Sequence, residues 1–282
     1  MSTGERGTDM GAGIRYTRIE HLMGTVFSVH VIGAPDRGRM PDAVDEAIDR
    51  TFAQLADVER VFSPFRSDSD ISRLRDGVAR LGDLDPRLTE VEIACRTLAL
   101  ESGGRFSGWR DGWFDPTGYV KGWATEQAAR THLAPLTGLD GILAVGLNAG
   151  GDVQVHTAAE AEWTWRIGIA DPRHPGAVLA TVELRDGGVA TSGTAERGTH
   201  IVDPRTGERA LQVLSSTVVA DGLTDADAWA TVGVVAGPDL SWLRDAPVRS
   251  GILVAADGAV RRFAHGVELA PAGDLLSCAR AR

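Results

Sequence analysis

Residues 113–125, WFDPTGYVKGWAT, form the stretch around which the rest of the chain is organised. It begins with two aromatic residues and turns at Asp115 and Pro116 before a predicted helix. Pro116 fixes its own φ and favours an extended conformation at Asp115. Gly118 can adopt backbone angles that other residues avoid and would allow a ligand to approach the main chain closely. The stretch therefore predicts an exposed loop that leads directly into a helix.

The predicted helix begins at Tyr119, which puts Lys121 in its first turn, on the side that faces the loop. A carboxylate (Asp115), a bare backbone (Gly118) and a lysine thus lie within seven residues. This grouping suits a polar ligand that carries phosphate groups and ring donors. The alternative is an ordinary strand-to-helix turn with a surface lysine, since a single motif is weak evidence.

Hydrophobic periodicity predicts helices mainly in the first half of the chain and strands mainly in the second. The expected helices cover residues 41–62, 70–75, 86–102, 119–133 and 224–235. The expected strands cover 16–32 (broken at 23–25), 142–147, 152–156, 163–169, 178–184, 188–193, 211–220, 252–255 and 260–263. This segregation favours an α+β fold over a doubly wound sheet. Residues 1–14 are polar and glycine-rich and are predicted to be disordered.

The bulk composition excludes several classes of protein. The 282 residues carry a net charge of −10 with no basic patch, which argues against a nucleic-acid partner. The two cysteines, Cys95 and Cys278, are far apart and have no CxxC partner, so neither a zinc site nor a disulfide is expected. No apolar run is long enough for membrane insertion. The N-terminal residues lack an apolar leader segment and a lipid-acceptor cysteine, which predicts a cytoplasmic location.

The predicted helix that follows Thr224 offers oxygen ligands for a hard cation. Asp227 and Thr231 lie four positions apart, so both oxygens project from one face. Mg²⁺ prefers oxygen ligands and retains some water or phosphate oxygens. The alternative is that Thr224 or Asp225 caps the helix while Asp227 complements its dipole.

Three further turns are candidates for ligand contact. Residues 200–207, HIVDPRTG, set His200, which exchanges protons near neutral pH, beside a sharp turn. Residues 191–194 offer hydroxyl and backbone N–H groups for phosphate, and residues 148–152, NAGGD, allow close backbone approach. The alternatives are a half-buried strand histidine and two ordinary turns. The NAGGD segment is not GxGxxG, and its strand–turn–strand context is wrong for a dinucleotide fold.

Taken in order, seven short segments resemble the motifs of the ApbE-type FAD:protein FMN transferases. They are MGT (23–25), FSPFRSDSDISRL (62–74), FDPTGYVKGWA (114–124), NAGGD (148–152), TSG (191–193), HIVDPRTG (200–207) and DADAWAT (225–231). The resemblance extends over about residues 20–237, and HIVDPRTG is its most specific part. The link between FDPT and VKG is compact compared with that of many members. Ala195-Glu196-Arg197 replaces a frequent Tyr-Arg after TSG, and Ala230 stands where some members carry a second metal-binding aspartate.

The resemblance implies a single domain over residues 15–270, followed by a tail at 271–282, with helices packed on largely antiparallel sheets. It implies cleavage of the FAD diphosphate and transfer of FMN to a Thr or Ser hydroxyl of a target protein, with release of AMP. Matching positions assign Mg²⁺ to the Gly118 carbonyl, Asp227 and Thr231. They assign FAD to Met23, Phe65, Trp113, Phe114, Asp115, Lys121 and Ile201.

Attack on a diphosphate needs a divalent cation to offset the developing charge and a group that accepts the hydroxyl proton. His200 is the predicted proton acceptor. Two other functions remain open: an FAD pyrophosphatase, in which water replaces the target hydroxyl, and a flavin-binding protein without catalysis. The Asp227 and Thr231 pair favours an enzyme over a binding protein.

Overall fold

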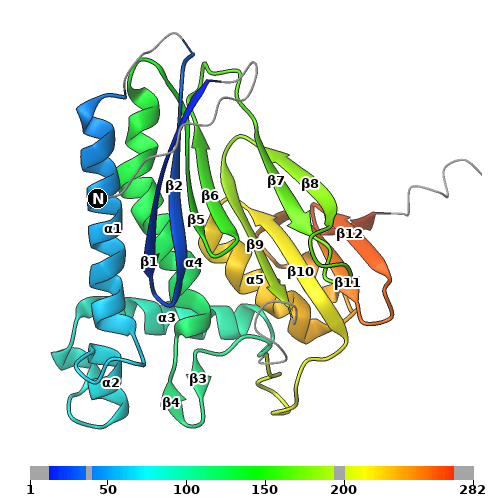
Figure 1. Cartoon of the computed structure of the whole chain (residues 1–282). Helices are drawn as coiled ribbons and strands as arrows, with labels where there is room; N and C mark the ends of the chain where they lie inside the picture. The colour runs from blue at the N-terminus through cyan, green and yellow to red at the C-terminus, as the bar shows by residue number, and fades with distance from the viewer. Residues whose placement is uncertain (1–12, 36–39, 194–200, 270–282) are drawn as a thin grey trace, which may run out of the picture.

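The computed structural model describes residues 13–35, 40–193 and 201–269. Its framework is a nine-stranded sheet in the order β1-β2-β5-β6-β9-β10-β11-β12-β13 (Figure 1). All neighbouring strands in it are antiparallel. The strands are Ile14–Leu22 (β1), Thr25–Gly33 (β2), Ile142–Ala149 (β5), Asp152–Thr157 (β6), Gly187–Gly193 (β9), Val213–Ala220 (β10), Val248–Ala255 (β11), Val260–Ala264 (β12) and Val267–Leu269 (β13).

Three helices cover one face of this sheet: Asp42–Phe62 (α1), Thr117–Ala128 (α4) and Leu223–Ala236 (α5) (Figure 1). Apolar residues recur along α1 at helical spacing and are buried, among them Ile48 and Leu55. They meet the inward side chains of the strands, such as Phe27 and Leu147, in the main core. Helix α4 continues into a π-helical turn at Ala129–Leu133 (η2) and a 3₁₀ turn at Ala134–Gly138 (η3).

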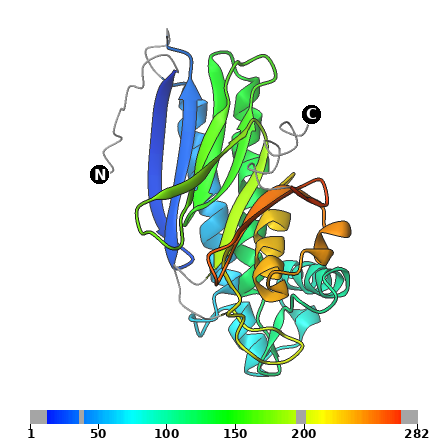
Figure 2. The same ribbon diagram turned by 90° about the vertical axis from the view of Figure 1, so that its right-hand side faces the viewer.

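A separate hairpin lies across the opposite face of the sheet, as Figure 2 shows. Its strands are Trp165–Ala170 (β7) and Val178–Leu184 (β8), which pair only with each other within the described residues. Trp165 and Leu184 pack there against Val155 and Val189 of the sheet in a second apolar cluster. The central strands are therefore buried on both faces.

The remaining elements gather below the sheet in the view of Figure 1. They are the helices Asp70–Arg75 (α2) and Pro86–Glu101 (α3), the short strands Trp109–Arg110 (β3) and Trp113–Phe114 (β4), and a 3₁₀ turn at Leu81–Asp83 (η1). Another 3₁₀ turn, Ser241–Arg244 (η4), packs against α5, where Trp242 stacks on Trp229. No helix among the described residues is long and apolar enough to cross a membrane.

The predicted α+β fold with largely antiparallel sheets is confirmed. One boundary of the central stretch is wrong: α4 begins at Thr117, not at Tyr119. The Asp115 carboxylate accepts hydrogen bonds from the Thr117 amide (3.2 Å) and hydroxyl (2.7 Å), which allows the helix to begin directly after Pro116. Gly118 consequently lies in the first helical turn. Strands β3, β4 and β13 were not predicted, because two or three residues are too few for a periodic pattern.

The ends of the chain are less fully described. Strand β1 begins at Ile14, the last residue of the predicted N-terminal tail. The described residues do not include the rest of that tail (1–12), the predicted C-terminal tail (271–282) or His200.

A half-buried histidine on β2 is expected to make the β1–β2 hairpin sensitive to acid. His30 contacts the Thr17 hydroxyl through Nδ1 (3.1 Å) and the Ser28 hydroxyl through Nε2 (3.0 Å). Burial, aided by Arg15, lowers the pKa of His30 from 6.5 to about 4. The unfolded chain therefore binds more protons between these two values, and stability is lost as the pH falls from about 6.5 toward 4.

We expect His30→Gln to reduce this acid sensitivity. Between about pH 7.5 and pH 5, the variant should lose about 1–2 kcal/mol less unfolding free energy than the wild type. Urea unfolding at the two pH values measures the difference. The control is His21→Gln at an exposed position of β1, which should retain the wild-type loss. If the wild type and His30→Gln lose equal amounts of unfolding free energy between the two pH values, the acid sensitivity does not come from His30.

Candidate active site

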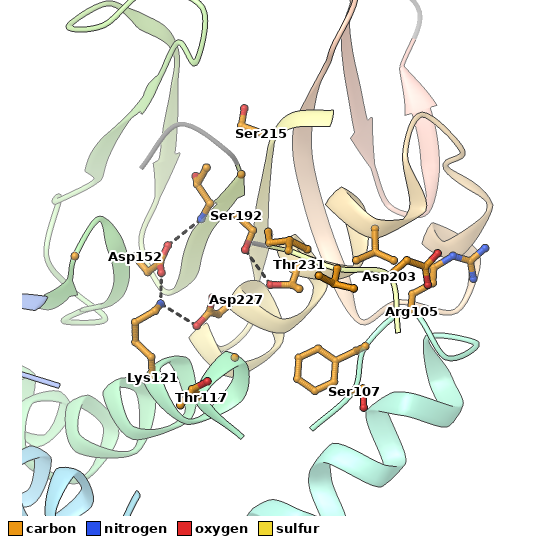
Figure 3. A pocket seen from close by; sticks show the side chains of 18 of the residues that line it. Arg105, Ser107, Thr117, Lys121, Asp152, Ser192, Asp203, Ser215, Asp227 and Thr231 are labelled. Atoms are coloured by element: carbon orange, nitrogen blue, oxygen red, sulfur yellow. Dashed lines mark hydrogen bonds and ion pairs between the residues drawn. The ribbon is translucent and has the colours of Figure 1, made fainter. Parts of the chain in front are cut away.

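A cleft of about 1020 Å³ opens between the helices and one end of the sheet (Figure 3). Its floor is formed by the first turn of α4, the start of β6, the end of β9 and the buried face of α5. Its rim is formed by residues of the β3–β4 hairpin, the loop 171–176 between β7 and β8, and the segment 201–207. Regular elements thus form the floor and loops form the rim.

An ion cluster occupies the floor of the cleft. The Lys121 ammonium on α4 contacts Oδ2 of Asp152 and Oδ2 of Asp227, the latter at 2.9 Å (Figure 3). Each carboxylate side chain is only 9% exposed, and the lysine side chain is 20% exposed. Three elements of the fold therefore meet at one ammonium group.

The electrostatics of the cluster are unbalanced. Burial alone would lower the pKa of Lys121, but Asp227 and Asp152 outweigh it and raise the pKa above its usual value. Burial raises the pKa of Asp152 to about 6, although Lys121 opposes this shift. One ammonium between two carboxylates leaves a net charge of −1 at neutral pH.

Hydrogen bonds from neighbouring strands hold Asp152 in place. The β5–β6 turn consists of Gly150 and Gly151, with φ of 63° and 106°, which glycine adopts without strain. The Asn148 side chain accepts the Gly151 amide hydrogen at 2.8 Å. Oδ1 of Asp152 accepts the amide hydrogen of Thr191 on β9 at 2.8 Å, which leaves Oδ2 for Lys121.

The start of α5 is fixed by side chains from outside that helix. Its N-cap is Gly222, which offers no side-chain cap. The Gln154 side chain accepts the Leu223 amide hydrogen and Glu126 accepts that of Thr224, both at 2.8 Å. The alternative interpretation, with Thr224 or Asp225 as the cap, is therefore wrong, since both lie inside the helix. Asp227 follows one turn after this anchored end.

Oxygen atoms suitable for a hard cation face the cleft beside this cluster. Asp227 and Thr231 lie one turn apart on α5, as predicted, and both line the cleft together with Gly118. The Thr231 hydroxyl lies 3.0 Å from the Ser192 hydroxyl. No group of three His, Cys, Asp or Glu that could hold a metal occurs in residues 13–35, 40–193 or 201–269. A carboxylate, a hydroxyl and a carbonyl beside an excess negative charge nevertheless fit Mg²⁺, which takes oxygen ligands and retains water.

Six of the predicted site residues line this one cleft: Asp115, Gly118, Lys121, Ile201, Asp227 and Thr231. Four others do not line it. Met23 lies in the β1–β2 turn with φ of 50°, and Phe65, in the loop after α1, is 96% exposed. Trp113 lies under the Arg75 guanidinium at 5.5 Å from its ring centroid, and Phe114 is buried against Trp109. Their contact with FAD stays a prediction.

The sequence did not reveal two polar groups of the cleft. The sequence marked Asp152 only as the end of a turn that allows close backbone approach, and its ion pair with Lys121 joins positions 31 residues apart. Arg105 also lines the cleft, and its buried Nε has no hydrogen-bond partner among the residues that the structure describes. The alternating pattern of the strand that begins at Asp152 was the one feature of the sequence that could have indicated the role of this aspartate. No sequence pattern pointed to Arg105.

The described residues define an α+β protein in which helices pack on largely antiparallel sheets and a polar cleft opens beside them. The chain belongs to the ApbE family, whose family model matches residues 110–250, half of the sequence. The FAD:protein FMN transferase of Rhodobacter capsulatus is 33% identical over 207 residues, which are 69% of this chain and 35% of that protein. The Escherichia coli K12 enzyme of the same name is 33% identical over 125 residues, 40% of this chain and 35% of its own length. The matched part is thus about a third of each relative.

Solved structures share the fold. The ApbE protein of Thermotoga maritima superimposes with a TM-score of 0.72 at 22% identity, over 88% of this chain and 96% of that one. The flavinyl transferase ApbE of Pseudomonas stutzeri gives 0.69 at 18% identity, over 91% and 97%. At these identities the likeness concerns the architecture.

The close approach of α4 to α5 at Gly122 yields a test of the geometry of the floor. A Cβ at Gly122 would lie 2.8 Å from Cβ of Asp227 and 3.0 Å from the Leu223 carbonyl oxygen. We expect Gly122→Ala to lower the unfolding free energy by about 1–2 kcal/mol, because overpacking exceeds the gain in helix propensity. Gly82→Ala, in open space, is the matched control and should change it by less than about 0.5 kcal/mol. Urea unfolding measures both variants. A Gly122→Ala variant with the unfolding free energy of the wild type would refute this packing.

Proposed function

We propose that this protein is a Mg²⁺-dependent FAD:protein FMN transferase. The observation that carries the proposal is the convergence of six predicted residues, from three separate segments, on one cleft of about 1020 Å³. Membership of the ApbE family and the names of its relatives support the same activity.

The cleft suits a ligand with a diphosphate between two ring systems. The Lys121 ammonium and the first turn of α4 favour phosphate oxygens, since a helix N-terminus carries partial positive charge. Asp115 and Ile201 line the same space and offer polar and apolar contacts to rings. We propose FAD as the substrate that binds there.

Mg²⁺ would be held by the Gly118 carbonyl, Asp227 and Thr231. When bound, the cation offsets negative charge on the diphosphate as its bridging bond breaks. The protein side chains orient the substrate: Lys121 attracts phosphate oxygens, while Asp227 and Thr231 remain fixed by the anchored start of α5.

The proposed reaction transfers FMN to a Thr or Ser hydroxyl of a target protein. The hydroxyl oxygen bonds to the phosphorus of the FMN half, the diphosphate bond breaks, and AMP leaves. We propose that His200 accepts the hydroxyl proton, because its reference pKa of about 6.5 leaves it largely neutral near pH 7. Its neighbour Ile201 lines the cleft, which supports this role. A cytoplasmic location and the absence of a nucleic-acid partner stay predictions.

Incubation with FAD, Mg²⁺ and a polypeptide that carries an acceptor Thr or Ser tests the function. Intact-protein mass spectrometry should detect an FMN adduct, together with an equal amount of AMP. Release of FMN and AMP without an adduct, in every acceptor tried, would favour the pyrophosphatase alternative. FAD binding without any AMP release would favour the non-catalytic binding protein.

The two side-chain ligands on α5 should contribute unequally to turnover. Asp227→Ala removes a charged oxygen and should lower AMP release by about 100-fold or more, because cation stabilisation is worth several kcal/mol. Thr231→Ala removes a neutral oxygen and should cost about tenfold. Glu183→Ala, on exposed β8, is a control that should retain the wild-type rate. Equal rates in the two ligand variants, or full activity in EDTA, would overturn the metal assignment.

A further inference from the structure

Lys121 is shared between two carboxylates that have different surroundings. Asp227 lies on α5 one turn before Thr231 and lines the cleft beside the proposed cation ligands. Asp152 lies at the start of β6 and is tied to β9 by its other oxygen, which accepts the Thr191 amide hydrogen at 2.8 Å. The same ammonium thus contacts one carboxylate that belongs to the proposed cation site and one that does not.

The charge of the cluster exceeds what a purely structural ion pair needs. A single carboxylate would neutralise Lys121, yet both aspartate side chains are only 9% exposed. Burial of an unbalanced charge is costly, and it is retained where it has a role or a further partner. The surplus negative charge therefore indicates a second cation at this place.

An ammonium and a divalent cation would both be attracted to the Asp227 carboxylate. Lys121 already lies 2.9 Å from its Oδ2. If Asp152 holds the ammonium, the Asp227 carboxylate is available to a divalent cation. If Asp152 loses its charge, Asp227 is the one carboxylate that remains in contact with Lys121, and the ammonium stays there.

We propose that Asp152 is a positioning residue that sets the affinity of the cleft for divalent cations by drawing Lys121 away from Asp227. This inference rests on the proposed function, because it assumes the cation site at Asp227 and Thr231. It adds a residue that contacts no proposed ligand of the metal and acts through Lys121.

The variant Asp152→Asn isolates this role. Asparagine retains an Oδ1 that accepts the Thr191 amide hydrogen, so the link to β9 persists. Its amide nitrogen replaces the oxygen that contacts Lys121, so the ion pair is lost. The matched control is Asp111→Asn, which removes the same charge at an exposed position on the rim of the cleft. Asp111 has φ of 52°, a conformation that asparagine tolerates well.

The measurement is binding of Mn²⁺, as a probe for Mg²⁺, to the protein without FAD, by titration calorimetry. Asp152→Asn should weaken binding by about tenfold or more, because Lys121 then stays on Asp227 in a poorly screened environment and competes with the metal for that carboxylate. Asp111→Asn should stay within about twofold of the wild type, since exposed charges are screened. Thermal unfolding of each metal-free variant checks that it is folded.

A second pair of variants tests whether Asp152 acts through Lys121. In a Lys121→Met background, Asp152→Asn should change Mn²⁺ affinity by less than about threefold, because no ammonium remains to be drawn away. An equal loss in both backgrounds would overturn the inference. If Lys121→Met does not fold, Asp152→Glu decides: it retains the charge and should retain the affinity, and a loss equal to that of Asp152→Asn would refute the proposal.

The outcomes separate this inference from the proposed function. A wild-type protein that binds no Mn²⁺ would contradict the cation site itself. If the wild type binds Mn²⁺ and both Asp152→Asn and Asp111→Asn bind it with nearly the same affinity as the wild type, the cation site stands and the role of Asp152 is refuted.

Discussion

The ion cluster of Lys121, Asp152 and Asp227 is the interaction on which the rest of the cleft depends. It joins α4, the sheet and α5 at one buried point, where Gly122 allows the two helices to approach each other. A lysine buried without its partners would be strongly destabilising, so the three elements hold their relative positions together. The contacts that complete the fold are therefore the same contacts that create the polar floor of the cleft.

Around this cluster, the long helices and the sheet form the floor of the cleft, and shorter segments form its rim. Gln154 from the sheet and Glu126 from α4 fix the first turn of α5, so the oxygens of Asp227 and Thr231 have little freedom. The rim consists of the β3–β4 hairpin, the loop 171–176 and the segment 201–207. In such a site the reactive side chains lie on helices and strands, while the loops contact the incoming ligand.

Local sequence patterns predicted most helices and strands, because amphipathic periodicity and turn residues act over a few positions. Helix α2 and strand β8 have the predicted bounds, and α1 and α5 differ from prediction by a residue at each changed end. The cluster itself was beyond such patterns, since Lys121 and Asp227 are 106 positions apart. The order of motifs implied that both belong to one site. Only the tertiary packing revealed that Asp152 joins them.

The two-glycine turn before Asp152 also limits how the length of this chain can vary. Side chains in a strand alternate between faces, so one additional residue there would rotate Asp152 and Gln154 away from the helices. The turn is further confined by Thr25, whose hydroxyl lies 2.3 Å from the position of a Cβ at Gly150. The turns at Gly176 and Gly258 have open space around them instead. We therefore expect an added residue to disturb the fold less at those two turns than at Gly150, where it would also change the direction of Asp152.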